Sequence, residues 1–217
     1  KVQMPLGYDK DGQLVTGFYK QRTNDIIACD ECLIQNEESN AVIQRVKELF
    51  VQYDIKPYDK TTHQGNIKHV LTKKGYHSEE FMLCFITYQK TIKHIDQIVE
   101  TLVQEFPHIK TIIQNINERH DNVILGDEEK ILYGQGYIYD TLLKNQYKIS
   151  LKSFYQINPI QVEVLYQTAI DLAHLNQDSV VLDAYCGIGT ITLSLAKHVK
   201  KVYGVEVVYQ AIEDAKN

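Results

Sequence analysis

Runs of apolar residues along the chain predict a mixture of strands and helices. Short apolar or alternating runs predict strands over residues 1–7, 14–20, 26–28, 67–73, 81–88, 109–117, 123–125, 131–133, 137–143 and 147–149. Apolar residues at helical spacing predict helices over residues 36–53 and 92–106, and Pro57 and Pro107 follow them. Residues 1–150 are therefore expected to form an α+β domain with an antiparallel sheet and two helices.

The pattern changes after residue 150. Asn158 and Pro159 are residue types suited to the N-cap and first position of a helix, and an apolar strand follows at residues 180–182. A glycine loop leads to a helix that begins at Thr190 and has Val199 on its apolar face, and a second strand over residues 202–205 ends at Glu206. Residues 151–217 are therefore expected to form the first part of a doubly wound, Rossmann-like α/β domain, which is truncated.

The glycine loop points to a nucleotide-like ligand. Gly187 and Gly189 let the backbone approach a ligand closely, and an acid after the next strand, Glu206, can accept hydrogen bonds from ribose hydroxyls. A dinucleotide fingerprint would require a third glycine where the chain has Thr192. The order Leu-Asp-x-x-Cys-Gly-x-Gly, with Asp183 second, resembles instead the first S-adenosylmethionine motif of methyltransferases. A dinucleotide site and a plain strand–helix crossover remain alternatives.

Composition limits the classes of protein without choosing among them. The chain has 217 residues, a net charge of −5 and 44% hydrophobic residues, which is ordinary for a globular protein. No apolar run is long enough to cross a membrane and no signal peptide is visible, so a cytoplasmic location without a membrane partner is expected. Neither part of the chain is basic, which argues against non-specific nucleic-acid binding but leaves a specific site open.

Several side chains have two interpretations each. Cys29 and Cys32 form a C-x-x-C pair without a second pair, so ordinary thiols are favoured over a zinc site. One strand carries four side chains that could contact a phosphate backbone: Lys68, His69, Lys73 and Lys74. A strand face exposed to solvent is the favoured interpretation for the lysines, and a packed histidine is favoured for His69. Gln156 could bond a ligand from the side opposite the glycine loop or cap a strand end.

Several segments together resemble the RNA uracil-5-methyltransferase family, and more closely its bacterial 23S ribosomal RNA branch. The segments that carry the resemblance are Asn-Ile-Lys-His-Val at 66–70, Asn-Val-Ile-Leu-Gly at 122–126, Ser-Phe-Tyr-Gln-Ile-Asn-Pro at 153–159, Leu-Asp-Ala-Tyr-Cys-Gly-Ile-Gly-Thr at 182–190 and Gly-Val-Glu at 204–206. The resemblance implies a methyltransferase that uses S-adenosylmethionine and acts on ribosomal RNA, with the domain at residues 1–150 facing the RNA.

The resemblance also implies roles for individual residues. Gln156 matches a glutamine that contacts S-adenosylmethionine near the reacting centre, Tyr185 an aromatic that lines the cofactor pocket, and Glu206 the acid that binds the ribose. Asp183, Gly187 and Gly189 belong to the same cofactor-binding motif. Many ribosomal RNA members hold a 4Fe-4S cluster on four cysteines, of which Cys32 matches the fourth; a cluster is not expected on Cys32 alone.

The catalytic residues of the family have no counterpart in this sequence. In the family a cysteine thiolate of a Ser-Cys-Asn segment adds to C6 of uracil, and a later glutamate removes the C5 proton. The chain contains no Ser-Cys-Asn, and Cys186 belongs to the cofactor loop. The chain also begins at Lys1 without an initiator methionine and ends inside a predicted helix. We therefore expect a fragment, lacking both ends, that cannot turn over.

Two other functions remain open at this point. The chain could belong to a methyltransferase for a small molecule or a protein, with an unrelated accessory domain at residues 1–150. It could also be a non-catalytic RNA-binding module, which would bind RNA without S-adenosylmethionine. The sequence does not indicate which uridine is modified, whether one or two are modified, or the oligomeric state.

Overall fold

The fold is described from a computed structural model, which covers residues 1–216. The chain divides into two compact units. The first contains residues 1–74 and 81–136, and the second contains residues 75–80 and 137–217. The strand pair at 137–150 belongs to the second unit, whereas the domain boundary that we predict from sequence lies at residue 150. Within the described residues, no helix combines the length and apolar character needed to cross a membrane.

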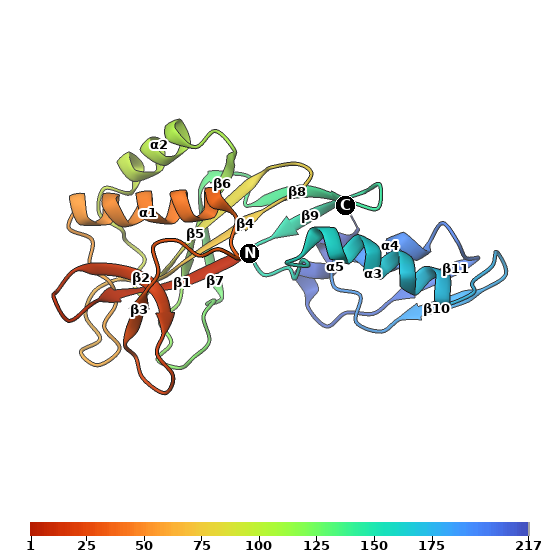
Figure 1. The fold of residues 1–217 in the computed structure, drawn as a ribbon, viewed down its shortest axis with the longest axis horizontal. Coiled ribbons are helices and arrows are strands. Elements are labelled where there is room, and N and C mark those ends of the chain that lie inside the picture. Colours follow the sequence, from red (N-terminus) through yellow and green to blue (C-terminus); the bar gives the residue numbers. More distant parts are fainter. Residues whose placement is uncertain (217) are drawn as a thin grey trace. The chain divides into compact units, whose positions relative to one another are not determined.

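The first unit is a seven-stranded sheet with two helices. In chain order its elements are β1 (Val2–Tyr8), β2 (Leu14–Tyr19), β3 (Ile26–Ala28), α1 (Glu37–Gln52), β4 (Ile67–Lys74), β5 (Phe81–Thr87), α2 (Ile95–Glu105), β6 (Ile109–Ile116) and β7 (Glu128–Gly134). The strand order in the sheet is β3-β2-β1-β4-β5-β6-β7. Both helices lie on one side of the sheet (Figure 1). The mixed α/β class expected from the sequence is confirmed.

One strand pair in this sheet differs from the antiparallel arrangement expected. β5 and β6 run parallel, with Cys84 opposite Ile113, whereas the other neighbouring strands in the sheet are antiparallel. The reason is α2, which carries the chain back across the sheet between the two strands. A crossover of this kind lets consecutive strands point in the same direction.

The core of the first unit lies between the sheet and its helices. Phe50 of α1 and Phe85 of β5 are fully buried, and their ring centroids are 5.4 Å apart. Ile98 and Leu102 of α2 belong to the same apolar cluster. The apolar face of each helix therefore packs on alternate residues of the sheet, as the spacing in the sequence predicts.

Residues 123–125 do not form the strand that their apolar character predicts. The side-chain amides of Asn115 in β6 and of Asn117 just after β6 form hydrogen bonds with backbone groups of this segment and of Gly126. Asn117 Nδ2 donates to the carbonyls of Val123 and Ile124, at 2.7 and 2.8 Å, and Asn115 exchanges two hydrogen bonds with the backbone of Gly126. The segment is thus an ordered loop held by asparagines, and the prediction of a strand is wrong.

The beginning of α1 depends on one side chain. Asn36 is the N-cap, and its Oδ1 accepts a hydrogen bond from the backbone N–H of Ser39 at 2.8 Å. We expect Asn36→Ala to lower the free energy of unfolding by about 1 kcal/mol, because a helix N–H loses its acceptor. Urea unfolding followed by circular dichroism measures the change. Asn36→Ser should retain most of the stability, and an equal loss in both variants would contradict the capping role.

His69 of β4 makes the first unit sensitive to acid. The residue is 7% exposed, and burial, followed by the charges of Lys60 and Lys68, lowers its pKa to about 4. The unfolded chain binds a proton on this imidazole below about pH 6.5, whereas the folded protein does not until about pH 4. Stability should therefore fall as the pH drops from about 6.5 to 4.

The variant His69→Gln removes this titration. Urea unfolding at pH 7 and at pH 5 should show a smaller loss of stability in the variant than in the wild type, since glutamine does not titrate. Equal losses in both proteins would contradict the assignment to His69.

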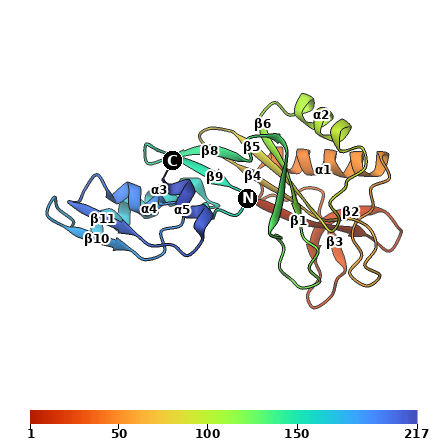
Figure 2. The ribbon, with the colours of Figure 1, turned by 180° about the vertical axis from the view of Figure 1, so that it is seen from behind.

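The described residues of the second unit, up to residue 216, form two small sheets and three helices. Its elements are β8 (Tyr137–Leu142), β9 (Asn145–Ser150), α3 (Pro159–Leu172), β10 (Val180–Asp183), α4 (Thr190–Leu195), β11 (Lys201–Gly204) and α5 (Tyr209–Ala215). β8 pairs with β9 in antiparallel fashion, and β10 pairs with β11 in parallel (Figure 2). The β10–α4–β11 segment is the strand–helix–strand unit expected from the sequence. α4 is shorter than expected, since it ends at Leu195 and leaves Val199 outside it.

Buried polar groups hold the second unit together. Asp214 of α5 is 3% exposed, and its carboxylate accepts hydrogen bonds from the backbone N–H and the hydroxyl of Ser150. The Ser153 hydroxyl donates to the same carboxylate.

Asn158 is the N-cap of α3 and accepts from the N–H of Gln161 at 3.0 Å, which confirms that the helix begins there.

Candidate functional site

The glycine loop and Glu206 meet at one edge of the β10–β11 sheet. The two strands are in parallel register, from Val180 opposite Lys201 to Asp183 opposite Gly204. Since the strands run in the same direction, the segments that follow their carboxyl ends lie at the same edge of the sheet. Ligands of open α/β sheets bind at this edge.

Glu206 is held by three backbone N–H groups. Its Oε2 accepts from Gly187 at 3.0 Å, and its Oε1 accepts from Val207 at 2.7 Å and from Val208 at 2.9 Å. These bonds, with that from Val208 first, lower the pKa of the carboxyl group below its usual value. Glu206 is therefore a fixed, ionised acceptor that spans the glycine loop and the end of β11. A carboxylate of this kind can accept hydrogen bonds from two vicinal hydroxyls.

The two glycines of the loop have left-handed backbone conformations. The φ angle is +55° at Gly187 and +82° at Gly189, which is the N-cap of α4. Such angles favour glycine because other side chains clash with the backbone. A Cβ atom placed on Gly187 would meet no atom within 4 Å, so the loop presents bare backbone beside open space. The loop thus has room for a ligand next to Glu206.

A set of contacts beneath the loop fixes its shape. The carboxylate of Asp183 accepts from the hydroxyl of Thr192 at 2.6 Å, which ties the end of β10 to α4. The N–H of Cys186 donates to the carbonyl of Val205 at 3.1 Å, and a Cβ on Gly204 would lie 2.9 Å from the Cys186 sulfur. Thr192 and Gly204 are not among the site residues that the sequence predicts, although both lie within the same strand–helix–strand stretch.

The surroundings of the Cys186 thiol disfavour a nucleophilic role. The residue is 8% exposed. Burial, followed by the carboxylates of Asp183 and Glu206, raises the pKa of the thiol. The thiolate is the reactive form of cysteine, so this environment works against nucleophilic attack. The structure agrees with the assignment of Cys186 to the loop.

The other two expected cofactor residues are Tyr185 and Gln156. Tyr185 is in the loop, but its side chain is 91% exposed. Gln156 is half-buried and lines a shallow hollow of about 470 Å³ together with residues of α3, among them Val162 and Leu165. None of the residues that line this hollow belongs to the glycine loop. The structure therefore brings together Asp183, Gly187 and Glu206, and leaves the roles of Tyr185 and Gln156 as predictions.

The residues present do not fit a 4Fe-4S cluster. Cys29 and Cys32 are half-buried free thiols, and the Cys29 sulfur donates to the carbonyl of Glu31 at 3.5 Å. Within residues 1–216, no three histidine, cysteine or acidic side chains are grouped so that they could hold a metal ion. A 4Fe-4S cluster requires four thiolates. No step of the chemistry is therefore assigned to such a cluster.

Comparison with known proteins identifies the family. Residues 6–217 match the model of the tRNA (uracil-5-)-methyltransferase family. The chain belongs to this family. Among curated relatives, an uncharacterized RNA methyltransferase of Halalkalibacterium halodurans is 46% identical over 216 residues. An uncharacterized RNA methyltransferase of Streptococcus agalactiae is 45% identical over the same length. The match covers all of this chain but 47% and 48% of the two relatives, so the chain spans about half of their length.

A solved structure of the family shares the fold. It is the crystal structure of the tRNA (uracil-54, C5)-methyltransferase of Pyrococcus abyssi in complex with S-adenosyl-L-homocysteine. The TM-score is 0.79 and the identity 25%, with coverage of 99% of this chain and 50% of the other. The match agrees with the fold class expected from the sequence, including its Rossmann-like methyltransferase part.

Proposed function

We propose that this chain holds S-adenosylmethionine at its glycine loop and is part of an enzyme that methylates C5 of a uridine in ribosomal RNA. The observation that carries the proposal is the Glu206 carboxylate, which backbone N–H groups fix beside Gly187. The S-adenosyl-L-homocysteine bound to the Pyrococcus abyssi enzyme supports the same class of ligand here.

The residues of the loop have distinct roles in this proposal. Glu206 accepts hydrogen bonds from the ribose hydroxyls, while Gly187 and Gly189 let the backbone approach the ligand. Asp183 keeps the loop in place through Thr192. Bound S-adenosylmethionine supplies a methyl group on a sulfonium centre, and the exposed ring of Tyr185 and the amide of Gln156 are proposed to contact it.

The choice of RNA is the finer part of the proposal. Ribosomal RNA is favoured by the segments at 153–159 and 182–190, which resemble the ribosomal branch of the family. Transfer RNA is the second candidate, because the Pyrococcus abyssi enzyme is named for uracil 54 of tRNA. We also propose a cytoplasmic location. In a longer protein, Cys32 is proposed to be one of the four ligands of a 4Fe-4S cluster.

We propose that the chain does not turn over by itself. None of its four cysteines lies in a Ser-Cys-Asn segment, and burial raises the pKa of the Cys186 thiol. Incubation with S-adenosylmethionine carrying a tritiated methyl group, and with unmodified 23S ribosomal RNA or tRNA, should leave the RNA unlabelled. Methyl transfer by this chain alone would contradict the proposal.

A protein of the relatives' length that includes this chain tests the choice of RNA. We expect the tritiated methyl group to appear in 5-methyluridine of ribosomal RNA and not in tRNA. Label in tRNA alone would support the second candidate, and label in a small molecule or a protein would overturn both.

A further inference from the structure

The first unit contains a basic cavity that the proposed methyltransferase site does not use. Its volume is about 380 Å³, and it lies between the turn after β2, the loop before β4 and the loop after β6. Five lysine or arginine side chains and one aspartate line it, in a chain whose net charge is −5. The cavity is thus a local concentration of positive charge, which favours an anionic ligand.

Two lysines of the cavity lie against aromatic rings. The Lys60 ammonium is 4.5 Å from the ring centroid of Tyr19, and the Lys68 ammonium is 4.7 Å from that of Tyr58 and 5.4 Å from that of Tyr88. Within the described residues, neither ammonium forms an ion pair with a carboxylate; Lys68 donates to the backbone carbonyl of Arg119. Burial, followed by the charge of Lys60, lowers the pKa of Lys68. An anion would relieve this repulsion.

Tyrosine and histidine side chains form one wall of the cavity. The Tyr58 hydroxyl lies 2.7 Å from Nδ1 of His63 and 3.0 Å from Nδ1 of His120, and the two imidazole centroids are 4.3 Å apart. Since a phenol has one proton to donate, one of the two imidazoles must donate its own. Both histidines are exposed, so a ligand can reach their rings.

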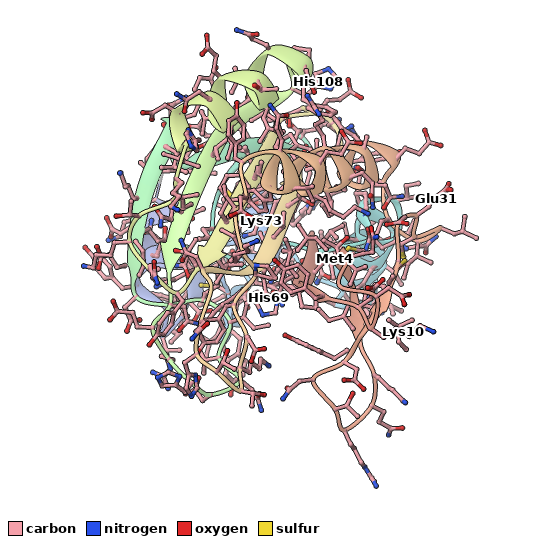
Figure 3. The ribbon with its side chains drawn as sticks, turned by 90° about the vertical axis from the view of Figure 1, so that its left-hand side faces the viewer. Met4, Lys10, Glu31, His69, Lys73 and His108 are labelled. Carbon is pink, nitrogen blue, oxygen red and sulfur yellow. The ribbon has the colours of Figure 1, made fainter. Side chains whose placement is uncertain are left out.

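His69 is a buried imidazole in the wall of the cavity. The residue lines the cavity and is 7% exposed, and its Nδ1 has no hydrogen-bond partner among the residues that the structure describes. Figure 3 shows His69 below α1, in the part of the first unit where the loops gather. Nδ1 is itself buried, so the part of His69 that a ligand in the cavity can reach is the rest of the ring.

We propose that this cavity binds one nucleotide of a single-stranded RNA segment, with a phosphate beside Lys60 and Lys68 and the base against the His63 and His120 rings. The His69 ring forms part of the cavity wall against which this nucleotide packs. Cationic side chains combined with flat rings are how proteins hold single-stranded nucleic acid. The inference rests on the proposed function, because RNA is the substrate class of that proposal. It adds an RNA-binding site within the first unit itself.

Fluorescence anisotropy with a labelled single-stranded oligoribonucleotide of about 12 residues tests the inference. The double variant Lys60→Gln/Lys68→Gln should bind at least about tenfold more weakly, and the slope of log affinity against log salt should fall by about 0.7 for each phosphate that is no longer neutralised. The matched control is Lys56→Gln/Lys90→Gln, which removes the same charge from exposed lysines of the first unit outside the cavity. Equal weakening in both would mean that bulk charge is responsible, and would overturn the inference.

A further variant tests the contribution of an uncharged wall of the cavity. His69→Ala should weaken RNA binding without changing its salt dependence, and circular dichroism should verify that each variant is folded. Uridine monophosphate should compete better than inorganic phosphate; equal competition would indicate an anion site only and contradict a nucleotide pocket. Glu206→Ala should keep RNA binding while losing S-adenosylmethionine, so failure of the proposed function and failure of this inference give different results.

Discussion

Glu206→Ala is expected to weaken S-adenosylmethionine binding by about 100-fold, because two hydrogen bonds from ribose hydroxyls to an ionised acceptor are lost. The variant also removes the acceptor for the N–H groups of Gly187, Val207 and Val208, so the loop loses the group that fixes it. Isothermal titration calorimetry of the wild type and the variant measures the difference. Glu206→Gln, which keeps one acceptor oxygen, should show an intermediate loss.

Asp178→Ala is the matched control for this prediction. Asp178 is an exposed acid just before β10, at the opposite end of that strand from the glycine loop. Its removal changes the net charge of the chain equally but leaves the carboxyl edge of the sheet intact. A loss of affinity in this control equal to that in Glu206→Ala would mean that the effect is one of general charge, and the assigned role of Glu206 would be wrong.

Phe85→Ala is expected to lower the free energy of unfolding of the first unit by about 3–5 kcal/mol. The Phe85 side chain is fully buried in β5 and packs against Phe50, with the ring centroids 5.4 Å apart. Its truncation loses the burial of the ring and leaves a cavity between the sheet and α1. Urea unfolding followed by the circular dichroism signal of the helices reports the change in midpoint.

Phe18→Ala tests whether the loss comes from burial. Phe18 is in β2 of the same sheet, but its side chain is 45% exposed. The same truncation there should cost much less, because less apolar surface returns to water. Similar losses at the two positions would contradict the description of the core.

Local signals in the sequence are enough to predict the β10–α4–β11 unit and its site. The apolar runs, the glycines and Glu206 lie close together along the chain, and a parallel strand pair brings the ends of its strands to one edge. The fixed carboxylate beside Gly187 follows from that geometry. Gln156 lies earlier in the chain, before α3, and its position relative to the loop depends on packing that the motif does not specify.

Interactions between distant residues explain what the sequence does not reveal. Residues 123–125 have the apolar character of a strand, but Asn115 and Asn117 occupy backbone groups of residues 123, 124 and 126. The basic cavity joins Tyr58, Lys68 and His120 from three segments, and no pattern in the sequence indicates that these side chains lie together. The sequence alone favours a solvated strand face for Lys68, whereas in the structure this lysine lines a cavity.

The most direct test of the central claim, that the glycine loop and Glu206 hold S-adenosylmethionine, is a calorimetric titration of this chain with S-adenosylmethionine and, separately, with NAD. We predict a saturable heat of binding for S-adenosylmethionine that is lost in Glu206→Ala, and none for NAD, since Thr192 replaces the third glycine of a dinucleotide fingerprint. Saturable binding of NAD, or S-adenosylmethionine binding that Glu206→Ala leaves unchanged, would contradict the claim.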